Sequence, residues 1–437
     1  MFQIKTGKTP IGLLTYLSIM SVCFIINLPG IAIAPMEGKL RAILDSPELK
    51  VQLLTTLPNF VIIPFVLLTG KLSLARHKIP WIVGSLLLYL LCAIGYLVLN
   101  SVEGLIIVSC LLGCANGILI PFAMGFVVNT FYGKYRTRHL GVKSAVSNLG
   151  VVIGSFAVGF LIEKDNWHIP FVVYLAVLLP LIFSFWLKDI PGLKAIVKGP
   201  ESSDSPISTK TDQSVSDSQA KKENFEVSSS AKGREIDMGR VWGLIGNNVC
   251  FSFIAMAIII YLPQRIENMG LLPSLSGEIT AIFFLFVLIA GFVLLPFVRL
   301  FRHFTFFTIG IFLAVGLCLI SFVPEKWALF IGSGLSGIAF GIFQPFIYDK
   351  TSYTVFNQKK AVVALSYVLT ALYLAIAVEP FVITGICKLF HIADENYFVF
   401  RLSLYMAILY SIIALVFRKK FAFSVEKAYI SEPAEEM

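Results

Sequence analysis

The sequence is a succession of apolar runs, each about as long as a helix that crosses a lipid bilayer. Such a helix needs about 20 predominantly apolar residues, and in lipid it must satisfy its backbone hydrogen bonds internally. Six runs precede a polar stretch in the middle of the chain, and six follow it. They cover residues 11–36, 49–69, 80–99, 104–131, 140–162, 169–187, 240–263, 275–298, 304–323, 327–349, 360–386 and 396–417. We therefore expect an all-α membrane protein with twelve transmembrane helices.

The composition agrees with lipid as the main solvent. Hydrophobic residues make up 57% of the 437 residues and charged residues 14%, whereas a soluble domain carries roughly 25% charged residues. The net charge of +9 does not indicate a nucleic-acid partner, because the basic residues lie in short clusters between apolar runs. No metal-ligand spacing, nucleotide-phosphate loop or nucleophile–base pair stands out, so we expect no metal, no cofactor and no enzymatic activity.

A polar stretch, residues 191–239, separates the two apolar halves. It is rich in Ser, Lys, Asp and Glu and has almost no large apolar side chains. Such a segment cannot bury enough apolar surface to offset the entropy lost on ordering. We expect a disordered linker between a six-helix bundle of residues 1–190 and a second bundle of residues 240–420, followed by a tail of residues 421–437.

Basic residues collect in alternate loops. The linker and the loops after the second, fourth, eighth, tenth and twelfth runs carry Lys and Arg, and the opposite loops carry sparse or mixed charge. Loops enriched in Lys and Arg face the cytoplasm in multi-pass proteins. The pattern therefore places the linker and both termini in the cytoplasm.

The two halves repeat each other. The pattern Ser-x-x-x-Gly-x-x-x-Gly-Ile-x-x-Pro-Phe occurs at residues 109–122 and again at residues 333–346, an offset of 224 positions (333 − 109). A Leu-x-Arg-His pattern recurs at residues 74–77 and 300–303. Six crossings are an even number, so the two units share one orientation and form parallel repeats about an axis along the membrane normal.

The repeated glycines and prolines suggest central helices. Small residues at every fourth position form a smooth helix face that lets a neighbouring backbone approach, and a proline one turn later bends the helix. Helix packing and a moving gate are the two roles that this pattern allows. The residues concerned are Gly113, Gly117, Pro121, Gly337, Gly341 and Pro345, together with Asp349 at the end of the tenth run.

These features resemble the major facilitator superfamily. The chain resembles that family in its twelve expected helices, its charged cytoplasmic linker and its basic loops after the second and eighth helices. Residues 70–78 resemble its loop motif, Gly-x-Leu-x-Asp-Arg-x-Gly-Arg, although Leu74 stands where the acid is expected. By this resemblance, the residues of the cytoplasmic loop motif are Gly70, Arg76 and Arg302.

Residues 136–150 and 166–171 look typical of bacterial members. The resemblance implies a monomeric secondary transporter of the inner membrane, in which two bundles expose a central cavity alternately to each side. Proton-coupled drug exporters of the family carry an Arg before the first glycine of the fourth helix, where this chain has Ser109 and Cys110. The chain therefore departs from the usual proton/drug antiport pattern.

Ionisable residues inside apolar runs are site candidates, because charge is costly in the bilayer. Glu379, followed by Pro380, is the best such carboxylate. Facing the interior, it would exchange a proton and couple transport to a proton gradient; near the headgroups, it would cap the kink at Pro380. Asp349 is expected to form a cytoplasmic gate or interface pair. Lys143, at the start of the fifth run, is expected to snorkel to the membrane surface.

Several amides lie on the first, fourth, seventh and tenth helices, which the resemblance places around the cavity. An amide in lipid needs a partner or water, so each of these residues binds substrate or makes an interhelical hydrogen bond. Asn27 also precedes Leu28-Pro29-Gly30, which predicts a break in the first helix. The candidate cavity residues are Asn27, Asn116, Asn247, Asn248 and Gln344.

The sparse charge favours a neutral or amphipathic small organic molecule as substrate, and we expect efflux with the proton as candidate coupling ion. Two alternatives stay open. One is uptake or exchange of a small metabolite. The other, from a different class, is a transporter-like membrane sensor or scaffold that signals through the linker.

Overall fold

The computed structural model describes residues 3–7, 10–30, 33, 36, 40, 43–46, 48–73, 78–161, 166–189, 235–271, 274–356, 360–392 and 395–425. Within these ranges it is almost entirely helical, apart from one short antiparallel pair, β1 (Gln3–Ile4) with β2 (Ile11–Gly12). Most of the expected linker and tail, and Arg76 of the loop motif, lie outside the described residues.

Helical segments coincide with all twelve apolar runs. The first half contains α1 (Leu13–Ile25), α3 (Glu48–Leu72), α4 (Ile79–Val98), α5 (Val102–Thr130), α6 (Lys134–Leu161) and a continuous helical stretch of η2 (Ile169–Val177), α7 (Leu178–Phe183) and η3 (Ser184–Asp189). The second half contains α10 (Met238–Asn268), α11 (Ser274–Phe301), η4 (Arg302–Phe304), α12 (Thr305–Phe322), α13 (Lys326–Ser352), α14 (Ala361–Leu389) and α15 (Glu395–Val416).

Among the described residues, nine helical spans are long and apolar enough to cross a membrane. One of them, residues 277–322, covers most of α11 and all of α12. The helix α1 and residues 56–72 of α3 are apolar but shorter. The early end of α1 at Ile25 confirms the predicted break beside Asn27.

Local sequence signals set several helix ends. The Ser101 hydroxyl accepts a hydrogen bond from the Gly104 N–H and caps α5. Pro80 lies in the first turn of α4, where its missing N–H is not needed. Gly133 joins α5 to α6 with a φ of 53°, a conformation that favours glycine because it has no Cβ.

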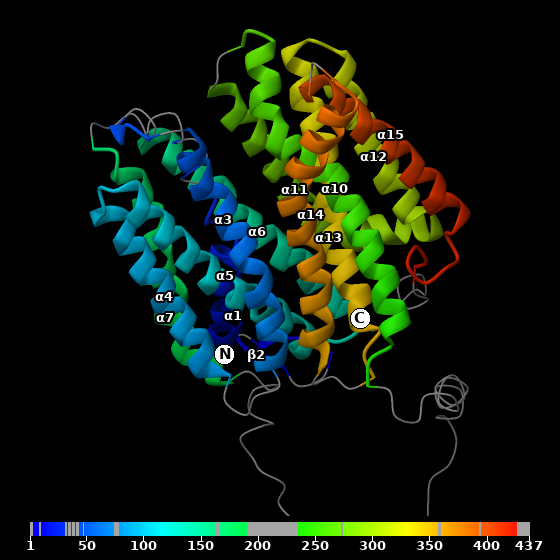
Figure 1. Ribbon diagram of the computed structural model, residues 1–437. Helices are drawn as coiled ribbons and strands as arrows, with labels where there is room; N and C mark the ends of the chain where they lie inside the picture. The colour runs from blue at the N-terminus through cyan, green and yellow to red at the C-terminus, as the bar shows by residue number, and fades with distance from the viewer. Residues whose placement is uncertain are drawn as a thin grey trace, which may run out of the picture.

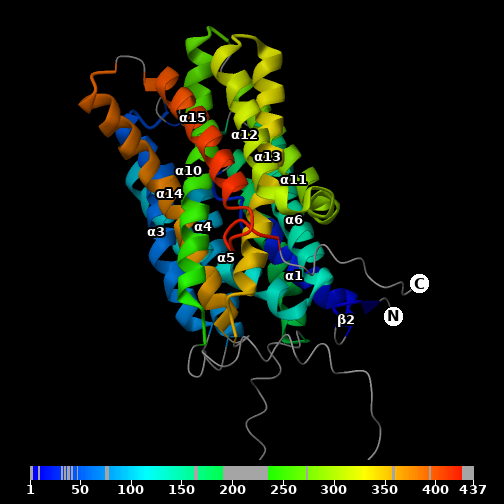
Figure 2. The ribbon, with the colours of Figure 1, turned by 90° about the vertical axis from the view of Figure 1, so that its right-hand side faces the viewer.

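The two halves stand side by side (Figure 1). Viewed after a quarter turn, α14 lies next to both α10 of its own half and α3 of the other half (Figure 2). The most extensive packing between the halves joins α6 to α11 and α3 to α14. We call the end of the molecule where Asp189 and Glu235 border the linker the linker end, and the opposite end the far end.

The helices α5 and α13 occupy equivalent central places. The most apolar window of each is 72% buried, against 28–56% for the other spans. Their repeated glycines pack in the same way. A Cβ on Gly117 of α5 would lie 2.9 Å from the carbonyl oxygen of Ile62 on α3, and a Cβ on Gly341 of α13 would lie 2.7 Å from that of Val287 on α11. The sequence repeat is thus also a structural repeat.

Candidate functional site

An ion pair between the two halves lies at the linker end. The Nε atom of Arg136, in the first turn of α6, donates to the Oδ1 atom of Asp349, near the end of α13, at 2.7 Å. The Thr137 hydroxyl donates to the other carboxylate oxygen at 2.7 Å. The Arg136 guanidinium also lies 4.5 Å from the centroid of the Tyr353 ring. Asp349 is fully buried, and Arg136 and Thr137 together engage both of its carboxylate oxygens across the two halves.

Glycines let the backbones of the two halves approach around this ion pair. A Cβ on Gly291 of α11 would lie 2.6 Å from the carbonyl oxygen of Gly141 on α6. A Cβ on Gly125 of α5 would lie 2.5 Å from the Val362 side chain on α14. Gly70, from the predicted loop motif, likewise lies against α14. These contacts and the Arg136–Asp349 pair join the two halves at the linker end; we call them together the linker-end gate, after the role proposed below.

The end of the expected linker is attached to the loop between α13 and α14. Ile236 forms an antiparallel bridge with Val355, and the Asp237 N–H donates to the Thr354 carbonyl oxygen at 2.9 Å. The Glu235 carboxylate pairs with Lys360. This loop also carries Tyr353 of the gate. Sequence reasoning assigned these residues to the linker and missed the attachment, because a bridge of this length has no distinct sequence signal.

Arg302, the other loop-motif residue within the described ranges, lies in η4 between α11 and α12. Its side chain is exposed, and its backbone has a φ of 46°. No ion pair involving it is found among the described side chains. The structure therefore does not bring Arg302 to the gate.

A cluster of polar side chains lies between α10, α13 and α14 in the second half. The Asn248 amide donates to the Val368 carbonyl oxygen at 2.8 Å. The Asn248 Oδ1 atom accepts from Ser252 at 3.2 Å and from Gln344 at 3.3 Å. All three polar side chains are buried, and the Gln344 Oε1 atom has no partner among the described residues. We call Asn248, Ser252 and Gln344 the amide cluster; Ser252 was not predicted.

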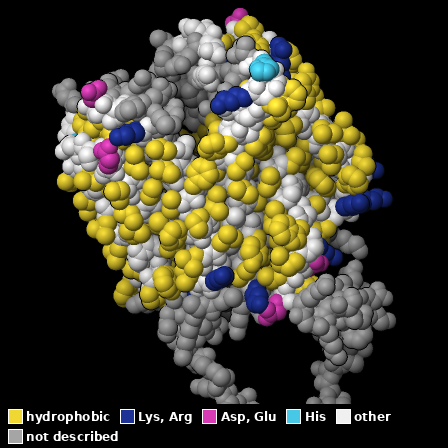
Figure 3. Space-filling model, in the orientation of Figure 1, with side chains coloured by type: hydrophobic (Ala, Val, Ile, Leu, Met, Phe, Trp, Pro, Cys, Tyr) yellow, Lys and Arg dark blue, Asp and Glu magenta, His cyan; other side chains and the backbone are white. Residues whose placement is uncertain are grey.

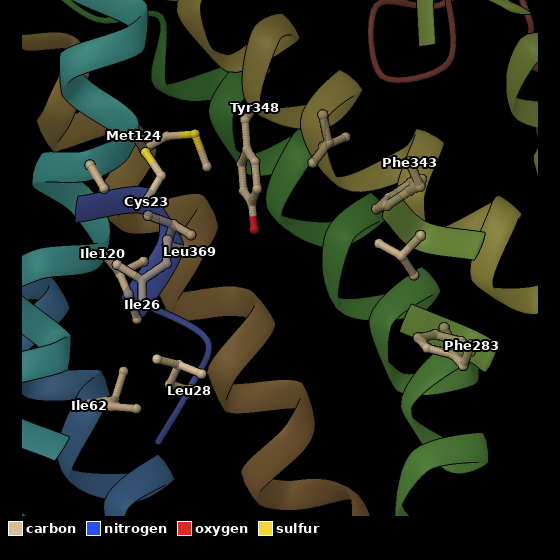
Figure 4. Close-up of a cluster of buried hydrophobic side chains, with 14 of the residues drawn as sticks. Cys23, Ile26, Leu28, Ile62, Ile120, Met124, Phe283, Phe343, Tyr348 and Leu369 are labelled. Atoms are coloured by element: carbon tan, nitrogen blue, oxygen red, sulfur yellow. The ribbon is translucent and has the colours of Figure 1, made fainter. Parts of the chain in front are cut away.

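The first half presents apolar side chains at the corresponding level. The repeat offset places Ile120 at the position equivalent to Gln344 (344 − 224). Figure 4 shows Ile120 close to Cys23, Ile26 and Met124, with Leu369 of α14 in the same group and the Tyr348 ring of α13 beside it. All of these side chains are buried. The first half therefore has apolar groups where the second half has the amide cluster.

Two of the three remaining candidate amides, Asn247 and Asn116, make structural contacts. Asn247 donates to the Ala422 carbonyl oxygen at 2.9 Å and accepts from the Tyr410 hydroxyl at 2.8 Å, so it faces α15 rather than the amide cluster. Asn116 of α5 donates to the Ile26 carbonyl oxygen at 2.9 Å and holds the break after α1. Asn27 is half-buried within that break.

Glu379 lies on α14 towards the far end. Its side chain is fully buried, and neither carboxylate oxygen has a hydrogen-bond partner among the described residues. It therefore makes no capping hydrogen bond at Pro380 in this structure. Two residues later, the Phe381 ring contacts Phe60 of α3 in the other half, with ring centroids 6.0 Å apart. The carboxyl thus lies on a helix that packs across the boundary between the halves.

The expectation that Lys143 snorkels to the membrane surface is wrong. Its side chain is 8% exposed on α6 and lies within electrostatic range of Cys23 on α1. The close packing of α1 on α6 covers it. A sequence position near a helix end does not reveal that a neighbouring helix blocks the path to water.

Comparison with known proteins supports this architecture. A family model described as Major Facilitator Superfamily matches residues 14–378. The proton:xylose symporter XylE, solved with 6-bromo-6-deoxy-D-glucose, superposes with a TM-score of 0.69 at 14% identity, covering 93% of this chain and 95% of the symporter. The human organic anion transporter MFSD10 (TETRAN) superposes with a TM-score of 0.64 at 14% identity, covering 92% and 97%. At such identity these likenesses show the fold alone.

A curated relative matches only part of the chain. The multidrug transporter protein MdtP of Bacillus subtilis (strain 168) is 28% identical over 176 residues, which are 40% of this chain and 32% of that protein. The matched region therefore spans about a third of the length of that relative. The family model, by contrast, covers most of the sequence. The resemblance inferred from the repeat and the loop motif is thereby confirmed, and the chain belongs to the major facilitator superfamily.

Proposed function

We propose that the protein is a secondary active transporter that moves a small organic molecule by alternating access. Twelve helices would cross the membrane as two six-helix bundles, with the linker and both termini in the cytoplasm of a bacterial cell and the bundles in its inner membrane. Each chain contains both bundles, so a monomer would suffice. The linker-end gate is the observation that carries the proposal, because alternating access requires a contact between halves that can close one side.

The buried side chains near the boundary between the halves support an amphipathic substrate. Its apolar part would pack against Ile26, Ile120 and Met124, and a hydrogen-bond donor would reach the Gln344 Oε1 atom, which has no partner among the described residues. A buried acceptor left unsatisfied is costly, so it favours a ligand that supplies a donor. This combination fits a neutral or amphipathic compound better than a highly charged one.

Efflux is the direction we propose, and the partial similarity to a multidrug transporter supports it loosely. Uptake or exchange of a small metabolite is the second candidate, and the fold shared with a proton:xylose symporter favours it. Transport measured in vesicles of defined orientation separates the two. Efflux predicts movement of the compound from the linker side to the far side.

We propose the proton as the coupling ion and Glu379 as the group that carries it. An ionised carboxylate without a partner is expensive to bury. A carboxyl that is protonated while buried and ionised when the bundles rearrange and admit water would couple proton movement to the conformational change. Its position on α14, which packs on α3 of the other half, supports this role.

The test is transport of a neutral, lipophilic fluorescent dye into proteoliposomes under an imposed pH gradient. Glu379→Gln should reduce gradient-driven accumulation at least tenfold and leave exchange of dye without a gradient largely intact. Glu278→Gln is the matched control, because Glu278 is exposed on α11. Full gradient-driven transport by Glu379→Gln would refute the coupling role, and no transport of any dye or metabolite by the wild type would refute the transporter.

A further inference from the structure

Cationic and aromatic side chains gather at the far end of the second half, where α10 and α12 end and α15 begins. The guanidinium of Arg265 on α10 lies 4.3 Å from the centroid of the Tyr397 ring. The guanidinium of Arg401 on α15 lies 5.1 Å from the same centroid and 5.6 Å from that of Phe322. Two like charges therefore share one aromatic ring. We call Arg265, Tyr397 and Arg401 the far-end arginine cluster.

Arg265 is buried without a counter-charge among the described side chains. It is 3% exposed, and its one hydrogen bond to a described residue runs from Nη2 to the Ser321 carbonyl oxygen at 3.4 Å, which is long. Its buried Nε–H has no acceptor. No described carboxylate forms an ion pair with Arg265 or Arg401. A buried guanidinium is normally paired, and among the described side chains the cluster lacks an anion.

Helix dipoles offset only part of this charge. Arg265 lies in the last turn of α10, and its hydrogen bond goes to the last turn of α12. Each carboxyl end is equivalent to about −0.5 of an elementary charge, and the amino end of α15 adds a positive partial charge. The two arginines carry two full positive charges, so the described groups of the cluster are together cationic.

The cluster opens towards the membrane surface. Arg401 is exposed, and three aromatic side chains nearby are each more than half exposed: Tyr405 on α15 itself, Phe322 on α12 and Trp327 on α13. Aromatic side chains of this kind mark the depth of the lipid headgroups. Figure 3 shows basic side chains at the upper rim of this half, above a continuous hydrophobic face. An anion that reaches the cluster would therefore come from the headgroup layer or from the water next to it.

We propose that the far-end arginine cluster binds an oxyanion, namely the phosphodiester of an anionic lipid headgroup or a free phosphate-type anion. A guanidinium offers parallel N–H donors that match two oxygens of a phosphate, and its plane stacks on an aromatic ring. Arg401 is the exposed contact. Arg265 supplies the buried Nε–H, and Tyr397 holds both guanidinium groups in place.

The first arm of the test measures lipid retention. Native mass spectrometry of the purified full chain, prepared with equal amounts of phosphatidylglycerol and phosphatidylcholine, counts bound lipids. We expect the wild type to retain phosphatidylglycerol, and Arg265→Gln and Arg401→Gln to retain about tenfold less, because each removes a charge-assisted contact. Arg401→Lys, which keeps the charge, should lie between. Arg299→Gln is the control, because Arg299 is exposed at the linker end of α11.

The second arm measures the melting temperature in a neutral detergent with added inorganic phosphate. If the variants retain less lipid and added phosphate does not raise the melting temperature of the wild type, the ligand is the lipid headgroup. A phosphate-induced rise that Arg401→Gln abolishes identifies a free anion. If Arg265→Gln does not fold, the exposed Arg401 variant carries the comparison. Equal phosphatidylglycerol retention by all variants together with no phosphate effect in the wild type would overturn the proposal, whatever the outcome of the transport assay.

Discussion

Arg136 and Asp349 each occupy the end of a helix that disfavours their charge. Arg136 lies in the first turn of α6, where the partial charge of the helix is positive, and Asp349 lies near the end of α13, where it is negative. Neither residue stabilises its own helix, and each compensates the other across the two halves at 2.7 Å. The pair is therefore a contact between the halves that opening of the linker end would break.

Removing one member of this pair should favour opening of the linker end. Arg136→Gln leaves Asp349 buried with only Thr137, a loss of about 3–5 kcal/mol in the closed state, or roughly a hundredfold or more in population. Spin labels at Lys71 and Lys419, which are exposed near this end, should then show a longer distance.

Arg299→Gln is the control, because Arg299 is an exposed arginine at the same end that forms no ion pair with a described residue. Its removal should leave the distance unchanged. Exchange of the two gate charges, Arg136→Asp with Asp349→Arg, should restore the short distance, because the swapped charges also agree with both helix dipoles. Unchanged distances in Arg136→Gln would show that this pair does not hold the gate.

Asn247 and Asn248 are adjacent on α10 but have different partners, so changes at Gln344, which bonds to Asn248, and at Asn247 should give different phenotypes. Gln344→Leu removes a hydrogen-bonding group next to Asn248 and should weaken substrate binding about tenfold, the equivalent of one hydrogen bond. Asn247→Ala breaks contacts to Tyr410 and Ala422 and should lower the melting temperature with little effect on affinity. Melting curves with and without ligand measure both stability and affinity. Loss of affinity in Asn247→Ala but not in Gln344→Leu would contradict the assignment of Gln344 to the substrate site and of Asn247 to a structural contact.

At the scale of elements, helix α6 determines how closely the halves approach. Its Gly141 lies against Gly291 of α11, and the same helix carries Arg136 and the buried Lys143. By contrast, the glycines of the repeated motif in α5 and α13 pack on helices of their own half. The motif glycines therefore build each bundle, whereas glycines outside the motif bring the bundles together.

A side chain at Gly141 should separate α6 from α11. A Cβ there overlaps the carbonyl oxygen of Gly291, which is backbone and cannot rotate away. Gly141→Val should therefore cost about 1–3 kcal/mol of stability, as overpacking does, and lower the melting temperature. Gly84→Val is the control, because a Cβ at Gly84 of α4 meets nothing within 4 Å. Equal melting temperatures for the two variants would show that α6 and α11 can accommodate the added side chain without loss of stability.

At the scale of the whole molecule, orientation is the testable property. The proposed topology places the linker in the cytoplasm and the turn before α13 outside. A membrane-impermeant maleimide applied to intact cells should label Glu325→Cys, and it should label Ser216→Cys only after the cells are opened. The wild-type chain, whose described cysteines lie within helices, gives the background. The reverse labelling pattern would invert the topology.

Much of the architecture could be predicted from local sequence. The apolar runs of helical length and the Leu28-Pro29-Gly30 break are patterns of residues that are neighbours in the sequence, and the repeat is visible when the two halves are compared. Helical segments appear at all twelve runs. The gate could not be predicted in this way, since Arg136 and Asp349 are 213 positions apart. The same holds for Lys143, whose burial depends on α1.

The sequence alone determined that the chain is embedded in a membrane, because the bilayer requires long apolar helices. It also determined that the chain consists of two related units, because a duplication leaves matching patterns. Tertiary structure alone decided which polar groups meet. Helix rotation directs Asn248 to Gln344 and Asn247 to Tyr410, although the two asparagines are neighbours. The approach of the halves then decides which charges are compensated: Asp349 has Arg136, while Glu379 and Arg265 have no opposite charge among the described side chains.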